Sequence, residues 1–376
     1  MILQKLTIDN FKNIARARLE LSPKINGFLG DNGMGKSNLL DAVYFLSFCK
    51  SFTGVSDSLI TRRDEIFCML KGEYIRRGTP EELTVGMGTG HRKSVKRRGK
   101  EYMRLSEHIG TFPLVLVSPA DIDLIRGSSD ERRRFMDMVI SQGDRRYLDE
   151  LIRYNHAVEQ RNRMLKDGCT DSGLFAAVEM PMARSAAYLH NARASWTEEL
   201  AKLFAEAYAS IAGNGELPEL SYQSQLNAPG TDMMSLLDER RQRDIAVKYT
   251  TGGPHRDDID LQLSGMPMRR TASQGQCKTF TIALRLAQYE FLRRATGLRP
   301  LLLLDDIFDK LDASRVERII TVVGRPEFGQ IFITDTNRTH LDEIMTRTGG
   351  DYSLWSVTDG QFEPIPHDAG QNTNGL

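Results

Sequence analysis

A glycine-rich stretch near the N-terminus sets the fold class, and it reads Gly30-Asp31-Asn32-Gly33-Met34-Gly35-Lys36-Ser37. It fits the pattern G-x-x-x-x-G-K-S, in which backbone N–H groups turn inward around phosphates along a path that side chains would obstruct. Residues 25–29 before it have the pattern of a strand, and residues 38–50 after it have the spacing of a helix. Strand, loop and helix in this order predict a P-loop that binds ATP, with Lys36 at the β- and γ-phosphates and Ser37 on Mg²⁺.

A second stretch supplies the other half of a nucleotide site. Residues 301–304 are four leucines, typical of a buried parallel strand, and Asp305 and Asp306 follow them directly. Ligands of α/β folds bind at the C-terminal ends of such strands. We therefore predict that Asp305 holds Mg²⁺ through its water shell and that Asp306 polarises the attacking water, with Lys36 as the third catalytic residue.

A third motif, Ser273-Gln274-Gly275-Gln276, precedes an apolar helical pattern over residues 277–292. A helix N-terminus with a serine hydroxyl and a glycine N–H suits an anion, although ordinary N-capping by Ser273 explains the same residues equally well. Two phosphate-binding helix ends in one chain suggest that this one serves the nucleotide of another subunit.

The chain length of 376 residues favours two structural units. Residues 128–247 have almost wholly helical patterns, whereas the flanking regions mix strands and helices. We predict an α/β ATPase head over 1–127 and 248–366, a helical arm domain over 128–247, and a disordered polar tail over 367–376.

Further elements follow from the same patterns. Strands are expected at residues 3–11, 67–74, 83–87, 113–117 and 330–334. In the arm, two long helices joined near residues 167–173 are expected to form a projecting hairpin. Pro181 is expected to bend or break the helical pattern of the second helix.

The composition restricts the possible partners. Because 50 basic residues balance 50 acidic ones, any affinity for nucleic acid must come from how basic residues are grouped. One such group lies before Glu101, in a stretch without acidic residues. It consists of Arg92, Lys93, Lys96, Arg97, Arg98 and Lys100. It is either a hairpin that contacts DNA phosphates or a solvated hairpin face, and the pattern favours neither. The four cysteines lie far apart, which argues against a zinc site and fits a reducing cytosol; no signal peptide or membrane-spanning stretch is expected.

Together these motifs resemble the bacterial RecF family of recombinational repair ATPases, which are relatives of ABC-type and SMC-type heads. The features local to RecF are Lys50-Ser51-Phe52, the run from Ser118-Pro119 to Arg132-Arg133-Arg134-Phe135-Met136-Asp137, and Gly253-Pro254-His255-Arg256-Asp257-Asp258. The resemblance covers the chain to about residue 360. It implies an ABC/SMC-type P-loop head interrupted by a mainly α-helical insertion domain, and Asp312 as the D-loop aspartate.

The resemblance also implies a cellular role. Such proteins are slow ATPases of DNA repair and replication. They form ATP-dependent homodimers on single-stranded and duplex DNA at junctions, act with RecR and RecO to help load RecA at gaps, and support the SOS response. The alternatives are a transporter ATPase subunit and a structural DNA clamp with negligible turnover. His255 and Arg256 are expected to be structural or to contact the nucleotide, since no nucleophile accompanies them. Arg132 to Arg134 are either a further basic group or a structural ion-pair site.

This sequence departs from the family pattern at several positions. Thr53 stands where an arginine is usual, Ala120 replaces an acidic residue, and Ser129 replaces a proline. Asp309-Lys310 replaces the usual Ser-Glu or Ser-His before the D-loop aspartate. Asp335 stands where the family commonly has threonine and ABC ATPases have the switch histidine, and a carboxylate facing the γ-phosphate would repel it.

Overall fold

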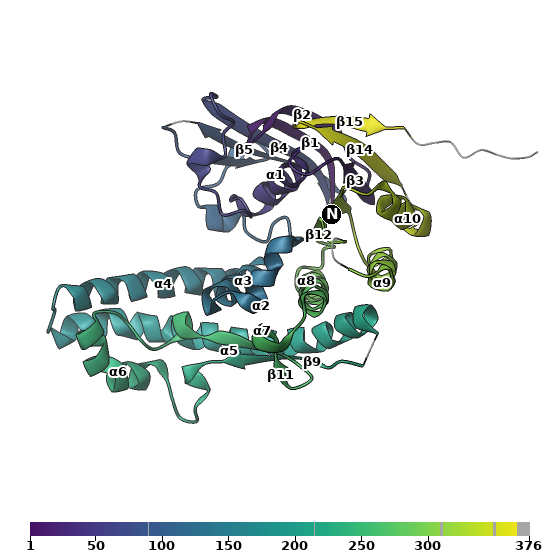
Figure 1. Cartoon of the computed structure of the whole chain (residues 1–376). Coiled ribbons are helices and arrows are strands. Elements are labelled where there is room, and N and C mark those ends of the chain that lie inside the picture. Colours follow the sequence, from purple (N-terminus) through teal and green to yellow (C-terminus); the bar gives the residue numbers. More distant parts are fainter. Residues whose placement is uncertain (89, 214, 309–310, 349–350, 367–376) are drawn as a thin grey trace, which may run out of the picture. The chain divides into compact units, whose positions relative to one another are not determined.

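The structure, a computed structural model, describes residues 1–88, 90–213, 215–308, 311–348 and 351–366. The chain divides into two compact units, one of Met1–Pro119 with Leu298–Leu376 and one of Ala120–Gly297 (Figure 1). The predicted domain boundaries differ from this division, because residues 248–297, predicted as part of the head, lie in the second unit. As functional domains the predicted boundaries remain a prediction, and the predicted tail over 367–376 lies outside the described residues.

The first unit contains an antiparallel sheet with the strand order β2-β1-β4-β5-β6-β7. Its strands carry alternating buried and exposed residues, as expected for a sheet with one face on the core. The bounds are β1 Ile2–Phe11, β2 Ile14–Glu20, β4 Phe67–Arg76, β5 Thr79–Gly88, β6 Ser94–Arg97 and β7 Lys100–Glu101. The strands predicted at 3–11, 67–74 and 83–87 are confirmed.

A second sheet of the same unit has the order β15-β14-β3-β13-β12-β8 and is parallel except for β15. Strands β8, β12 and β13 are buried throughout, which explains their continuous apolar runs. The bounds are β3 Ile25–Leu29, β8 Leu114–Val117, β12 Leu301–Asp305, β13 Ile331–Asp335, β14 Tyr352–Thr358 and β15 Gln361–Ile365. The strands predicted at 25–29, 113–117, 301–304 and 330–334 are confirmed.

Helix α1, Lys36–Phe48, contacts strands of both sheets. Nearly all of its sides are therefore buried, which explains why most of its residues are apolar. The predicted helix over 38–50 is therefore confirmed, with its start two residues earlier. The other helices of this unit are α9 Ala313–Val323 and α10 Arg338–Thr348.

The second unit is mainly helical (Figure 1). Its helices are α2 Ile122–Arg126, α3 Ser129–Gly143, α4 Arg145–Lys166, α5 Ser172–Ala212, α6 Met233–Val247, α7 Met268–Thr271 and α8 Gln274–Thr296. It also holds a small antiparallel sheet of β9 Pro218–Gln223, β10 Asp258–Leu263 and β11 Met266–Pro267. Within the described residues, no helix of the chain is long and apolar enough to cross a membrane.

Helices α4 and α5 pack along each other and form the predicted hairpin (Figure 1), and their connection, residues 167–171, lies within the predicted range of 167–173. Helix α5 continues through Pro181, so Pro181 does not break it, and Pro181 lies on the exposed side of the helix. A bend there remains a prediction. The strand β9 lies inside the region predicted as almost wholly helical. It pairs with β10, a partner about 40 residues further along the chain.

Buried ion pairs join the helices of the second unit to the segment after α6. Arg161 is fully buried and donates to Glu179 at 2.8 Å, to Asp244 at 2.7 Å and to the Thr250 hydroxyl, which follows α6, at 3.0 Å. Arg193 donates to Asp257 at 2.8 Å and to the Pro254 carbonyl at 2.6 Å. Because buried charges are stable only when they are paired, these contacts hold residues 250–257 within this unit.

Candidate nucleotide-binding site

The glycine loop connects the end of β3 to the start of α1 and needs glycine at two positions. Gly33 and Gly35 have φ of 84° and 110°, in the left-handed region that other residues avoid. A Cβ on Gly35 would lie 2.8 Å from the Asn13 side-chain amide nitrogen. The loop therefore uses two glycines at conformations that other residues avoid, as its sequence pattern predicts.

Lys36 lies in the centre of this loop. Its side chain is buried at the first position of α1, and the ammonium donates to the carbonyl oxygens of Gly30 at 2.6 Å and Asp31 at 3.0 Å. Asp31, Asn32 and Gly33 are exposed around it. The loop thus presents one positive charge at the N-terminus of a 13-residue helix, which is suited to an anion.

The outer side of the loop is anchored through the Met34 carbonyl oxygen. It accepts the N–H of Gly360 at 2.8 Å and the side-chain amide of Asn13 at 3.4 Å. Asn13 also accepts a hydrogen bond from Asn38 at 2.8 Å. Sequence reasoning did not identify Asn13 or Gly360, because both lie in hairpin turns remote from the loop in sequence.

The structure brings Ser37 and Asp305 together, although they are far apart in the chain. The Ser37 hydroxyl donates to Asp305 Oδ1 at 2.9 Å. Asp305 is the last residue of β12, and burial raises the pKa of its carboxyl above the ordinary value, while the hydrogen bonds from Thr334 and Ser37 oppose that rise. The predicted pair of Mg²⁺ ligands therefore forms one cluster of oxygen atoms.

Asp306 follows the strand in a left-handed conformation with φ of 51°. Its N–H donates to the hydroxyl of Thr334 at 3.1 Å, and that hydroxyl donates to Asp305 Oδ1 at 2.7 Å. Sequence reasoning missed Thr334. The available signal was a single hydroxyl in an otherwise apolar strand, directly before Asp335.

Asp335 and Asp312 have local partners. Asp335 is buried at the end of β13, and its Oδ1 accepts the N–H of Asn337 at 2.9 Å. Asp312 caps α9, accepting the N–H of Arg315 at 2.9 Å and the hydroxyl of Ser314 at 2.8 Å. Asp309 and Lys310 lie outside the described residues.

The turn Ser273 to Gln276 lies in the second compact unit, at the N-terminus of α8. Ser273 is the N-cap: its hydroxyl accepts the N–H of Gln276 at 3.2 Å, and the Gln276 side chain accepts the N–H of Ser273 at 2.9 Å. The capping interpretation is therefore confirmed. Gln274 and Ser273 are exposed and Gly275 is partly exposed, so the helix end is open to a ligand.

The predicted cationic cluster divides into two groups. Arg97 makes paired hydrogen bonds to Glu81, one of 2.7 Å, and Arg98 lies 3.3 Å from the same carboxylate. Lys93 donates to Asp57 at 2.7 Å and to the Cys49 carbonyl. By contrast, the remaining three side chains are exposed and have no ion-pair partner within the described part of the chain: Arg92, Lys96 and Lys100.

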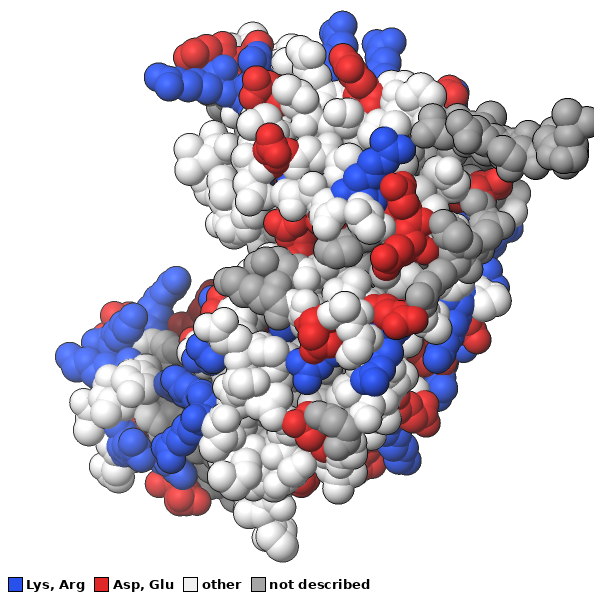
Figure 2. All heavy atoms as spheres, turned by 45° about the vertical axis from the view of Figure 1, so that its right-hand side comes forward, with Lys and Arg blue, Asp and Glu red and all other residues white. Residues whose placement is uncertain are grey.

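A second basic surface lies on the helical unit. Figure 2 shows Lys and Arg side chains gathered over one end of this unit, at the lower left. Exposed basic residues of α4 and α6 include Arg163, Lys166 and Arg243. Two surfaces of the protein could therefore attract DNA phosphates.

The residues for which a structural role was one prediction have structural contacts. Arg132 donates to Asp258 at 2.6 and 2.9 Å. The two ring nitrogens of His255 bond the Tyr154 hydroxyl at 2.7 Å and the Thr250 carbonyl at 3.0 Å, and burial lowers its pKa to about 4. These contacts support the structural interpretation of both residues.

Thr53, at the position where an arginine is usual, has polar partners. Its hydroxyl accepts a hydrogen bond from Lys12 at 3.1 Å and lies 2.8 Å from the Ser51 hydroxyl. Lys12 pairs at 2.6 Å with Asp41, which is fully buried in α1. These contacts connect the segment after α1 to α1 itself.

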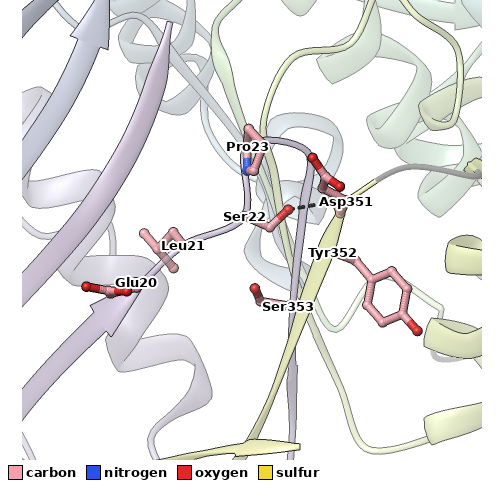
Figure 3. A pocket seen from close by; sticks show the side chains of 7 residues that line it. All are labelled: Glu20, Leu21, Ser22, Pro23, Asp351, Tyr352 and Ser353. Carbon is pink, nitrogen blue, oxygen red and sulfur yellow. Dashed lines mark hydrogen bonds between the residues drawn. The ribbon is translucent and has the colours of Figure 1, made fainter. Parts of the chain in front are cut away.

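A hollow of about 400 Å³ lies at the other end of the parallel sheet (Figure 3). Its lining comes from the residues before β3 and at the start of β14, where the Ser22 hydroxyl donates to the Asp351 carbonyl at 2.6 Å. Because ligands of parallel sheets bind at the C-terminal ends of the strands, this hollow is not the nucleotide site.

Comparisons with known proteins agree with this geometry. Residues 1–96 match the family model described as an AAA ATPase domain. The chain is 49% identical to the DNA replication and repair protein RecF of Parabacteroides distasonis, over 97% of this chain and 100% of the relative. It is 47% identical to the same-named protein of Porphyromonas gingivalis, over 96% of this chain and 100% of that one.

Solved structures give the same result for the fold. A structure described as the recombination mediator protein RecF-ATP in the RecFOR pathway superposes with a TM-score of 0.87 at 28% identity, covering 97% of this chain and 98% of that one. An Smc head domain from Pyrococcus furiosus superposes with a TM-score of 0.58 at 16% identity, covering 97% of this chain and 96% of that one, which shows a shared fold. The predicted ABC/SMC-type head with an insertion is confirmed.

Proposed function

Because the chain belongs to the RecF family of DNA replication and repair proteins, we propose that it is an ATP-dependent DNA-binding protein of recombinational repair. ATP binding would drive dimerisation on DNA near junctions of single and double strands. There the protein would help load RecA at gaps together with RecR and RecO, and support the SOS response, in the cytoplasm. The observation that carries the proposal is the 2.9 Å contact that joins Ser37 of the glycine loop to Asp305.

ATP would bind on the loop with Mg²⁺ beside it. Lys36 would contact the β- and γ-phosphates, because its ammonium already lies in the centre of the loop. Ser37 and Asp305 would hold Mg²⁺, which prefers oxygen ligands and needs only one or two from the protein. The bound ion would neutralise charge on the phosphates. Asp306 would orient the attacking water.

The second half of each site would come from another subunit. The turn Ser273 to Gln276 opens α8, whose N-terminus carries a partial positive charge. In a two-fold dimer this turn would lie on the γ-phosphate held by the partner's loop. Asp312 would lie at the same interface. Hydrolysis would then separate the subunits, and a slow turnover would time the release of DNA.

DNA would bind through the exposed members of the cationic cluster. Arg92, Lys96 and Lys100 are exposed, so that they can approach phosphates. Lys93 and Arg97 are held by Asp57 and Glu81 and would support the hairpin. This divides the candidate DNA contacts into direct and structural ones. Binding would be largely independent of sequence.

Molecular mass in solution tests ATP-dependent dimerisation and DNA binding in one experiment. The parent should be a monomer or weak dimer without nucleotide and a dimer with ATP and Mg²⁺, and duplex DNA should add to the mass of the dimer. Lys36→Met should lose both tight ATP binding and dimerisation, because the loop loses its positive charge. Lys202→Met, at an exposed position of α5, is the matched control. If Lys36→Met binds ATP within a few-fold of the parent, the site assignment is wrong.

A further inference from the structure

We propose that Thr334 is a positioning residue that fixes the two acidic residues of the nucleotide site at once; the proposal rests on the ATPase function given above. Thr334 is fully buried in β13. Its hydroxyl donates to Asp305 Oδ1 at 2.7 Å and accepts the N–H of Asp306 at 3.1 Å. One side chain thus contacts the residue assigned to Mg²⁺ and the residue assigned to the attacking water.

The direction of both hydrogen bonds is determined by chemistry. A backbone N–H can only donate, so the Thr334 oxygen must accept from Asp306. The single hydroxyl proton is then available for the Asp305 carboxylate. A hydrogen bond to a charged group is stronger than a neutral one, and the hydroxyl is therefore held in one rotamer.

Asp305 gains a fixed orientation from this contact. Its Oδ1 accepts from Thr334 on one side and from Ser37 on the other. Two donors on one oxygen set the plane of the carboxylate before any ion arrives. Loss of one donor would leave the carboxylate free to rotate, so that the site would need more Mg²⁺ to fill.

Asp306 gains support for an unfavourable backbone. Its φ of 51° is in the left-handed region, which residues with a Cβ rarely adopt, although aspartate does so more readily than most. The hydrogen bond from its N–H to Thr334 holds this conformation and so sets the direction of its side chain. The strand order places β13 between β12 and β3, so that Thr334 stands between the acidic residues and the strand that leads into the loop.

The experiment compares Thr334→Val with Thr334→Ser in the full-length protein. Valine keeps the shape and the methyl group but removes the hydroxyl, whereas serine keeps the hydroxyl. We expect Thr334→Val to bind a fluorescent ATP analogue in EDTA as the parent does. It should need roughly ten-fold more Mg²⁺ for half-maximal hydrolysis, because a hydrogen bond to a charged group is removed, and its maximal rate should fall. Thr334→Ser should stay within about three-fold of the parent.

Thr321→Val is the matched control, since Thr321 lies on the exposed side of α9 and bonds a helix carbonyl. It should leave the Mg²⁺ dependence unchanged. The positioning role is wrong if Thr334→Val matches the parent, if Thr334→Ser is as impaired as Thr334→Val, or if nucleotide binding in EDTA is lost. Failure of the proposed function is distinct, because then the parent itself would neither bind nor hydrolyse ATP.

Discussion

Exposed and ion-paired members of the cationic cluster should respond differently to substitution. The change is the triple replacement of Arg92, Lys96 and Lys100 by alanine. Removing a side chain that binds one phosphate reduces the slope of log K against log salt by about 0.9 for duplex DNA. If all three side chains bind phosphates, the slope should fall by roughly 2.7. Folding should be unaffected, since these side chains are exposed.

Arg97→Ala should lower the stability of the fold and leave the salt slope nearly unchanged. The Glu81 side chain is only 2% exposed, and Arg97 is its closest partner, while Arg76 and Arg98 lie further away at 3.7 and 3.3 Å. Removing one partner of a buried ion pair costs about 3–5 kcal/mol when nothing replaces it. Because two arginines remain, we expect a decrease of about 2 kcal/mol in the free energy of unfolding, and little change in the salt slope.

Fluorescence anisotropy of labelled duplex DNA, titrated at several salt concentrations, measures the slope. The matched control removes three charges from the helical unit, at Arg163, Lys166 and Arg243. An unchanged slope in the first triple variant would refute the hairpin as a DNA surface. If the slope falls in the control variant instead, the phosphate contacts belong to α4 and α6.

Three further predictions concern the nucleotide site and the core. Lys36→Met and Ser273→Arg should each be inactive, and an equal mixture should regain roughly a quarter of parental ATPase activity, since half the dimers are hetero and each has one complete site; no recovery despite heterodimer formation would contradict independent shared sites. Asp306→Asn should trap an ATP-bound dimer that chromatography detects, and hydrolysis at the parental rate would move the catalytic role elsewhere. Burial lowers the pKa of His108 to about 4, so the folded state resists protonation and the free energy of unfolding should fall as the pH drops below about 6.5. Between pH 7.5 and 5 this decrease is roughly 2 kcal/mol, and urea unfolding should show it reduced in His108→Gln.

Local patterns predicted the elements that form the site. The strand 25–29, the loop and the helix after it were predicted because each depends on residues only a few positions apart. The same holds for the strand of leucines before Asp305. The absence of a break at Pro181 has a related cause: the helix around it is held by packing against α4, which propensity alone does not include.

The interpretation of charged residues from sequence was less successful. Lys93 and Arg92 are neighbours with the same charge, yet Lys93 is paired with Asp57 and Arg92 is exposed. The pattern could not separate them, because the partners lie on other strands and turns. For Arg132 a structural ion pair was one of two predicted roles, and Asp258, its partner, lies 126 residues away.

The sequence by itself determined that a phosphate-binding loop opens a helix and that two acids end a buried strand, because glycine content and apolar periodicity act over short distances. Only the tertiary structure decided which side chains meet. Ser37 and Asp305 are separated by 268 residues, and Thr334 and Asp305 by 29. Neither contact can be predicted from these separations. The order of strands in the parallel sheet makes both contacts possible. Strand β13 lies between β12 and β3, so that the ends of all three strands lie at the same edge.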